Sequence, residues 1–132
     1  MVEIYTDGAS RGNPGKSACS FVFVENKEIV LMQAEYLGIS TNNVAEYKAI
    51  IKALEEAKRS FFDEIKLISD SKLVILQIRK EYKTKAKHLE ELNKKVLAIT
   101  KSFKKIEFKN VTRENKYIRL ADKLCNLMLD NS

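Results

Sequence analysis

The sequence predicts an α/β protein in which a mixed sheet is flanked by helices. Residues 2–37 are rich in β-branched and aromatic residues and are interrupted only by turn sequences, which indicates consecutive antiparallel strands. From residue 43 onward, segments with apolar residues three and four apart alternate with two short strand-like segments. With 132 residues, of which 45% are hydrophobic, the chain can build one ordinary core but not two. We therefore expect a single domain over residues 1–132.

Alternating side chains and turn residues mark the first three strands. Residues 2–7 alternate apolar and polar side chains up to Asp7-Gly8, so we expect the first strand to carry Asp7 at its carboxyl end. Residues 17–25 and 28–37 are β-rich, and Asn26-Lys27 between them predicts a tight turn.

The later elements alternate between helix and strand. We predict helices over 43–59, 71–80, 89–99 and 117–129 and strands over 64–69 and 104–111. The strand over 64–69 ends at Asp70. If this strand lies parallel to the first one, Asp7 and Asp70 emerge side by side at the sheet edge where ligands bind in open α/β sheets.

Residues 7–15 hold three of the four glycines and the only proline. This concentration predicts a shaped turn whose backbone approaches something bulky, with a plain hairpin connection as the alternative. A phosphate-binding P-loop is excluded for three reasons. Ser10 replaces its first glycine, Pro14 lacks an amide hydrogen, and a strand follows Lys16 where the motif needs a helix.

The net charge of +6 comes from one segment. Residues 80–105 contain nine lysines and three glutamates, whereas the rest of the chain is balanced. Clustered lysines of this kind suit a polyanion-binding face, although a solvated helix surface gives the same pattern.

Each acidic residue in these elements also has an ordinary structural explanation. Asp7 precedes a glycine and fits a turn, Asp70 could cap the following helix, and residues 43–46 are close to a capping box. Their arrangement changes the interpretation. Glu46 is in register with apolar residues four, seven and eleven positions later, and Asp122 falls on the apolar side of the last helix.

Four carboxylates at one sheet edge would repel one another unless they shared a cation. Carboxylate ligands without histidine or thiolate favour hard ions, so we expect Mg²⁺, with Mn²⁺ as the alternative. Two such ions about 4 Å apart can activate a water and stabilise the leaving oxygen in an attack on phosphorus. The sequence therefore predicts a metal-dependent nuclease whose metal-binding and catalytic residues are Asp7, Glu46, Asp70 and Asp122.

Four segments resemble the signature blocks of type 1 ribonuclease H. They are DGASRGNPG at 7–15, TNNVAEY at 41–47, SDS at 69–71 and LADKL at 120–124, in the order of the family. The resemblance implies the ribonuclease H-like fold, a five-stranded mixed sheet with three antiparallel strands followed by two parallel ones, flanked by helices. It also implies an endonuclease that hydrolyses the RNA strand of RNA/DNA hybrids and leaves 5′-phosphate and 3′-hydroxyl ends.

The same resemblance assigns residues to the site. The four carboxylates align with the metal ligands of the family. RNA is distinguished by its 2′-hydroxyls, and the residues implied on that side of the minor groove are Ser10, Gly12, Asn13, Asn42, Asn43 and Glu46. Thr41 and Asn13 align with residues that hold a phosphate of the DNA strand. Lys72 stands where relatives often have glutamine and is a candidate for another substrate contact.

The sequence departs from the family before Asp122. Many relatives carry a catalytic histidine there, in a pattern like GHxGxxxNExAD, but residues 111–122 contain none. Arg113 or Glu114 is the candidate to assist proton transfer or product release instead. The only histidine, His88, lies in the basic segment, where we expect a surface or substrate contact.

Two further departures concern substrate binding. The chain after Asp70 looks shorter than in relatives with a long basic protrusion, so we expect the lysine-rich segment to contact the DNA strand's phosphates instead. The first strand begins almost at Met1, and we therefore expect no amino-terminal hybrid-binding module.

Three functions fit these observations. The leading one is hybrid-specific cleavage. The second is a nuclease of the same fold that cuts double-stranded RNA or DNA junctions, but the glycine- and asparagine-rich blocks argue against a junction enzyme. The third is a catalytically silent hybrid-binding module. The presence of all four carboxylates argues against it.

We expect a soluble, cytoplasmic monomer that does not bind membranes. No apolar stretch approaches the roughly 18 residues of a membrane span, and the amino terminus lacks the pattern of a signal peptide. Cys19 and Cys125 lie in apolar contexts and are expected to be core thiols rather than a disulfide or zinc ligands.

Overall fold

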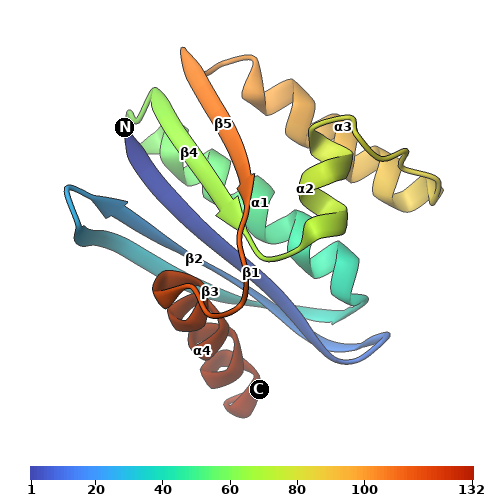
Figure 1. Cartoon of the computed structure of the whole chain (residues 1–132). Coiled ribbons are helices and arrows are strands. Elements are labelled where there is room, and N and C mark those ends of the chain that lie inside the picture. Colours follow the sequence, from blue (N-terminus) through green and yellow to red (C-terminus); the bar gives the residue numbers. More distant parts are fainter.

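The computed structural model describes residues 1–132, which form five strands and four helices (Figure 1). In chain order they are β1 (Val2–Gly12), β2 (Gly15–Glu25), β3 (Glu28–Ser40), α1 (Asn42–Arg59), β4 (Glu64–Ser69), α2 (Lys72–Ile78), α3 (Lys87–Thr100), β5 (Lys105–Asn110) and α4 (Lys116–Asp130). None of the helices is long and apolar enough to cross a membrane.

The five strands form one mixed sheet in the order β3-β2-β1-β4-β5. β1, β2 and β3 pair antiparallel, whereas β4 pairs parallel with β1 and β5 pairs parallel with β4. This topology confirms the predicted mixed sheet. It places β1 and β4, the strands that lead to Asp7 and Asp70, next to each other in the same direction.

Alternation along the strands builds a core on each face of the sheet. Ile4 and Leu67 point to the face that α1, α2 and α3 cover, and they belong to the larger core cluster. Tyr5 and Ile68, one residue later in each strand, point to the opposite face under α4. Figure 1 shows α4 alone on its side of the sheet. This strict alternation follows from the two-residue period of a strand.

β1 is longer than predicted, and this changes the place of Asp7. The strand continues through Asp7 to Gly12, because residues 7–12 pair antiparallel with residues 15–20 of β2. The parallel pairing with β4, by contrast, stops at Thr6 opposite Ser69. The prediction that Asp7 ends the strand was therefore wrong. Asp7 lies where the parallel ladder ends and the antiparallel one continues.

The glycine-rich segment is the hairpin between β1 and β2. Gly12, at φ 104°, pairs with Gly15 across a two-residue turn made by Asn13 and a cis Pro14. The alternative interpretation of this segment, a hairpin connection, is therefore correct in that the segment joins β1 to β2. The turn at Asn26-Lys27 is confirmed, with φ of 52° and 65° at its two residues.

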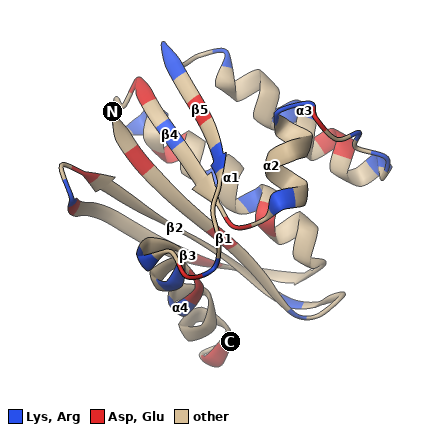
Figure 2. Ribbon diagram, viewed as in Figure 1, with Lys and Arg blue, Asp and Glu red and all other residues tan.

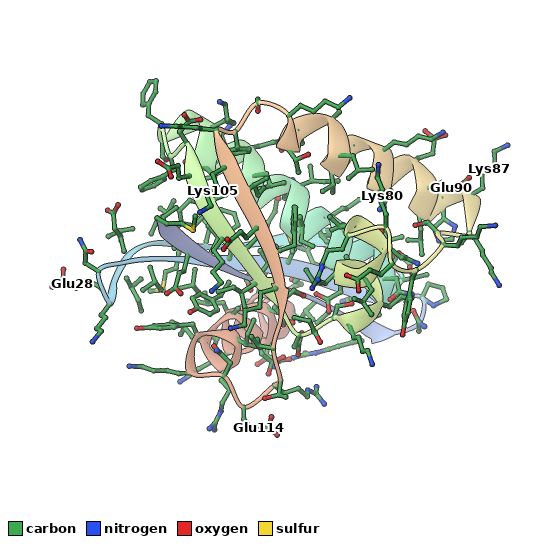
Figure 3. All side chains as sticks on the ribbon, turned by 45° about the horizontal axis from the view of Figure 1, so that its top comes forward. Glu28, Lys80, Lys87, Glu90, Lys105 and Glu114 are labelled. Carbon is green, nitrogen blue, oxygen red and sulfur yellow. The ribbon has the colours of Figure 1, made fainter.

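The lysine-rich segment, residues 80–105, begins just after α2 and spans the connection to α3, α3 itself and the start of β5. All nine of its lysines are exposed. In Figure 2 basic positions mark this connection and α3, and in Figure 3 Lys87 projects away from the body of the molecule. The segment therefore presents its charge to solvent, away from the α4 side of the sheet.

Candidate metal centre

Three carboxylates meet where the parallel strands end. Asp7 comes from β1, Asp70 follows the last residue of β4, and Glu46 lies in the first turns of α1. Each offers an oxygen, and these oxygens all lie within 4.8 Å of one another. The structure thus brings together three of the four predicted carboxylates in one tight group.

The ordinary explanations for Asp7 and Asp70 do not hold. Asp7 is not a turn residue, because it pairs with Ser20 inside the β1–β2 ladder. Asp70 does not cap α2, because Ser71 is the N-cap and its hydroxyl accepts a hydrogen bond from the Val74 amide at 3.4 Å. Neither carboxylate is therefore explained by a turn or by a helix cap.

Glu46 is likewise free of a capping role. Thr41 is the N-cap of α1, and its hydroxyl accepts from the Val44 amide at 3.3 Å. The Glu46 carboxylate instead reaches across to β1, where the Gly8 amide donates to its Oε1 at 2.7 Å. This bond holds one Glu46 oxygen against the strand that carries Asp7.

Two of the three carboxylates are buried without a compensating positive charge at hydrogen-bond distance. Asp7 is 5% exposed and Glu46 is 6% exposed. The Oδ2 atom of Asp7 is buried and has no hydrogen-bond partner. An ionised carboxylate is costly to bury in this way unless a cation or a donor completes it. The donor set therefore fits a hard divalent cation.

Burial and neighbouring negative charges raise the pKa of all three carboxyl groups. Burial, followed by the charges of Asp70 and Asp122, raises the pKa of Asp7 to about 8. Burial and the neighbouring Asp7 and Asp70 raise the pKa of Glu46 well above its ordinary value. The pKa of Asp70 is raised by burial, although Arg113 opposes the shift. Without a cation, the group thus resists full ionisation.

Asp122 lies at the same cleft but outside the tight group. It lines a cavity of about 340 Å³ together with Asp7, Glu46 and Asp70. Its side chain is exposed on α4, and its Oδ2 accepts from Asn126 Nδ2 at 3.5 Å. All four predicted acids therefore line one cleft at this edge of the sheet. Only Asp7, Glu46 and Asp70 have carboxylate oxygens within 4.8 Å of one another.

Two arginines line the cleft beside the carboxylates. Arg113 Nε lies 4.0 Å from Asp70 Oδ2, and Arg119 lines the same cavity from α4. Glu114, the other loop candidate, is fully exposed and points outward (Figure 3). The sequence reasoning missed Arg119. Its spacing of three residues from Asp122 on a helix was the available signal.

The predicted substrate residues gather where the hairpin meets the start of α1. The Asn42 amide donates to Asn13 Oδ1 at 3.0 Å, and the Ser10 amide donates to Asn42 Oδ1 at 3.3 Å. Gly12 lies in the same hairpin, and Asn43 lies in the first turn of α1. Asn42 also lines the cleft. These contacts join the two asparagine-containing blocks into one surface.

Other predicted residues lie apart from the carboxylates. Lys72 is exposed at the first position of α2 and does not line the cleft. His88 is exposed on α3. Cys19 and Cys125 are buried and free, which confirms the prediction of core thiols.

Gly8 allows α1 to approach β1 closely enough for the Glu46 contact. A Cβ at this position would lie 2.2 Å from the Ala45 carbonyl carbon and 2.4 Å from the Glu46 amide nitrogen. Because these are backbone atoms, α1 would have to move. Gly8→Ala is expected to lower the free energy of unfolding by about 3 kcal/mol, as measured by urea denaturation, and to reduce any metal-dependent activity.

Gly38→Ala is the matched control. A Cβ added at Gly38 would have no atom within 4 Å, so the only cost comes from its φ of +77°. This change should cost only about 1 kcal/mol of backbone strain and leave the site intact. An equal loss of stability in the two variants would contradict the close approach of α1 at Gly8.

Comparison with known proteins agrees with the fold. Residues 5–128 match a family model described as reverse transcriptase-like. The chain is 37% identical to ribonuclease HI of Halobacterium salinarum, over 99% of this chain and 65% of that protein. It is 34% identical to a bifunctional protein of Mycobacterium tuberculosis, over 98% of this chain. The chain spans 35% of the length of that mycobacterial protein.

Solved structures show the same architecture. The crystal structure of ribonuclease H1 from Halobacterium salinarum matches with a TM-score of 0.94 over 99% of this chain and 98% of that one. The LC11 ribonuclease H1, solved in complex with an RNA/DNA hybrid, is 36% identical and matches with a TM-score of 0.91, again over 99% and 98%. The family model, the identity to ribonuclease HI and the matching crystal structure together show that the chain belongs to the type 1 ribonuclease H family.

Proposed function

We propose that this chain is an endoribonuclease that hydrolyses the RNA strand of RNA/DNA hybrids and leaves 5′-phosphate and 3′-hydroxyl ends. The observation that carries the proposal is the group of Asp7, Glu46 and Asp70, whose oxygens lie within 4.8 Å of one another. Two relatives support the substrate class: one is named ribonuclease HI, and another was solved with an RNA/DNA hybrid.

The metal we propose is Mg²⁺, which Mn²⁺ can replace, with two ions per site. Asp7, Glu46 and Asp70 would hold the inner position, and Asp122 would complete the site from α4. The unpartnered Asp7 Oδ2 and the all-oxygen donor set fit such ions. When bound, two ions lower the pKa of a water and stabilise the charge of the leaving oxygen.

The protein's own groups prepare this site. The Gly8 amide holds Oε1 of Glu46, which orients this carboxylate next to Asp7. The Arg113 guanidinium lies beside Asp70, and a guanidinium carries only hydrogen-bond donors, so it has no acceptor with which to take a proton from water. Of the two roles considered for the loop before α4, we therefore assign Arg113 to phosphate contact and product release rather than to proton transfer.

Recognition of the hybrid would divide between two surfaces. The joined blocks around Ser10, Asn13 and Asn42 offer amide groups next to the cleft, which suits the 2′-hydroxyls of an RNA strand. The exposed lysines of residues 80–105 suit the phosphates of the DNA strand, whose binding releases counterions and weakens as salt increases. Thr41 and Asn13 are the candidates for contact with a DNA-strand phosphate, and Lys72 is a candidate for another substrate contact.

The proposal is tested by incubating the protein with labelled RNA/DNA hybrid, double-stranded RNA or duplex DNA, each with Mg²⁺, Mn²⁺ or a chelator. We expect internal cleavage of the RNA strand of the hybrid in either metal and no cleavage in chelator. End analysis should show 5′-phosphates. Cleavage of double-stranded RNA at the same rate would refute hybrid specificity, and binding without cleavage in every metal would refute the enzymatic function.

A further inference from the structure

Arg11, in the hairpin between β1 and β2, reaches across to the last turns of α4. Its Nη2 atom lies 2.5 Å from Asp130 Oδ1, 3.3 Å from the Asn126 carbonyl oxygen and 3.5 Å from Asn126 Oδ1. Arg11 belongs to the glycine-rich segment, but its side chain does not line the carboxylate cleft. Its contacts join residues 115 to 119 positions apart in the chain.

The contact of Arg11 with Asn126 Oδ1, at 3.5 Å, indicates which way the Asn126 side-chain amide faces. A guanidinium group only donates hydrogen bonds, so the amide oxygen must face Arg11. The amide nitrogen then faces the other way, toward Asp122, where Nδ2 lies 3.5 Å from Oδ2. Arg11, Asn126 and Asp122 thus form a continuous chain of contacts from the hairpin to the cleft.

Asp122 needs such support more than the other carboxylates do. Asp7 and Glu46 are 5% and 6% exposed, and Glu46 is also held by the Gly8 amide. Asp122 is exposed on the surface of α4, and Asn126, one helical turn later, is the only side chain that hydrogen-bonds it. An exposed aspartate without a partner would sample several rotamers and lose entropy when it binds an ion.

We propose that Arg11 and Asn126 are positioning residues that hold the Asp122 carboxylate toward the cleft and thereby strengthen metal binding. The inference rests on the proposed function, because it takes Asp122 as a metal ligand. Neither residue touches the reacting atoms. Arg11 orients Asn126, Asn126 donates to Asp122, and Asp130 anchors Arg11 from the other side.

A simple charge effect predicts the opposite change in metal affinity when Arg11 is removed. Removing a cationic side chain near a cation site strengthens metal binding by electrostatics alone. If Arg11 acts through Asn126, Arg11→Leu instead weakens metal binding. Arg59→Leu is the matched control, because Arg59 also pairs with an acidic residue, Glu56, but does so at the end of α1 and outside the cleft.

The experiment titrates the substrate-free protein with Mn²⁺ and follows free Mn²⁺ by electron paramagnetic resonance. Asn126→Leu and Arg11→Leu are each expected to weaken Mn²⁺ binding by about 10-fold, as is usual when a ligand's supporting partner is removed. The double variant should be no weaker than Asn126→Leu, because both changes interrupt one chain of contacts. Arg59→Leu should bind Mn²⁺ as the wild type does.

Two further measurements separate positioning from a general structural role. Thermal unfolding in chelator should be nearly the same for wild type, Asn126→Leu and Arg11→Leu, because these side chains lie on the surface. In the Asp122→Asn background, Asn126→Leu should have no further effect on Mn²⁺ affinity. With hybrid substrate, Asn126→Leu should raise the Mg²⁺ concentration needed for half-maximal cleavage, while kcat recovers at saturating Mg²⁺.

The outcomes separate this inference from the proposed function. If wild type binds Mn²⁺ and cleaves hybrid but both single variants bind Mn²⁺ with unchanged affinity, the positioning role is overturned and the nuclease remains. Additive losses in the double variant overturn the route through Asn126. A wild type that neither binds Mn²⁺ nor cleaves hybrid overturns both proposals.

Discussion

Asp70→Asn is expected to reduce the rate of hybrid cleavage on the order of 10³-fold, or about 4 kcal/mol in activation free energy. Asp70 is the most accessible of the three clustered carboxylates, and its oxygen lies within 4.8 Å of those of Asp7 and Glu46. The amide keeps the shape of the side chain but removes the charge that would hold a cation. Single-turnover cleavage at saturating Mg²⁺ measures the effect.

The same change should leave the metal-free protein as stable as the wild type or slightly more stable. Replacing Asp70 removes a negative charge that raises the pKa of both Asp7 and Glu46. Thermal unfolding in chelator tests this expectation. Glu64→Gln, an exposed carboxylate at the other end of β4, is the control and should alter neither activity nor stability. If Asp70→Asn retained more than about a tenth of the activity, the assignment of the metal site would be wrong.

The metal-free protein is expected to lose stability as the pH rises from about 5 to 8. The pKa of Asp7 is raised from 3.8 to about 8, so across this interval the folded state binds a proton that the unfolded state has released. The free energy of unfolding therefore falls with rising pH, by up to about 1 kcal/mol per pH unit from this group. Glu46 acts in the same direction.

Urea denaturation in chelator at pH 5, 6, 7 and 8 measures this slope. Asp7→Asn should flatten it, because the amide cannot ionise. Saturating Mg²⁺ or Mn²⁺ should flatten it as well, because a bound cation favours the ionised carboxylates, and the stabilisation by metal should grow with pH. A wild-type slope that matches that of Asp7→Asn in chelator would mean that Asp7 is not held protonated in the folded state.

Local patterns were sufficient to predict most of the fold. Alternation in β1 assigns Ile4 and Tyr5 to opposite faces, and the structure places them in different core clusters. Helical spacing predicts α1 within one residue of its observed start at Asn42. These features depend on the periods of strand and helix, which neighbouring residues alone determine. The motif blocks likewise predict the four carboxylates, because this prediction depends only on residue types and their order in the sequence.

Other features depend on residues that are distant in the sequence, and only the tertiary structure decides them. β1 extends past Asp7 because β2 pairs with residues that show no strand periodicity of their own. Glu46 faces Asp7 because Gly8 lets α1 approach β1, and Arg11 contacts Asn126 because α4 packs back toward the hairpin. The raised pKa of Asp7 follows from burial and from the charges of Asp70, which follows β4, and Asp122, on α4. The sequence pattern predicts which acidic residues form the site. Their burial, the distances between them and their hydrogen-bond partners depend on contacts that form only when the helices and strands pack together.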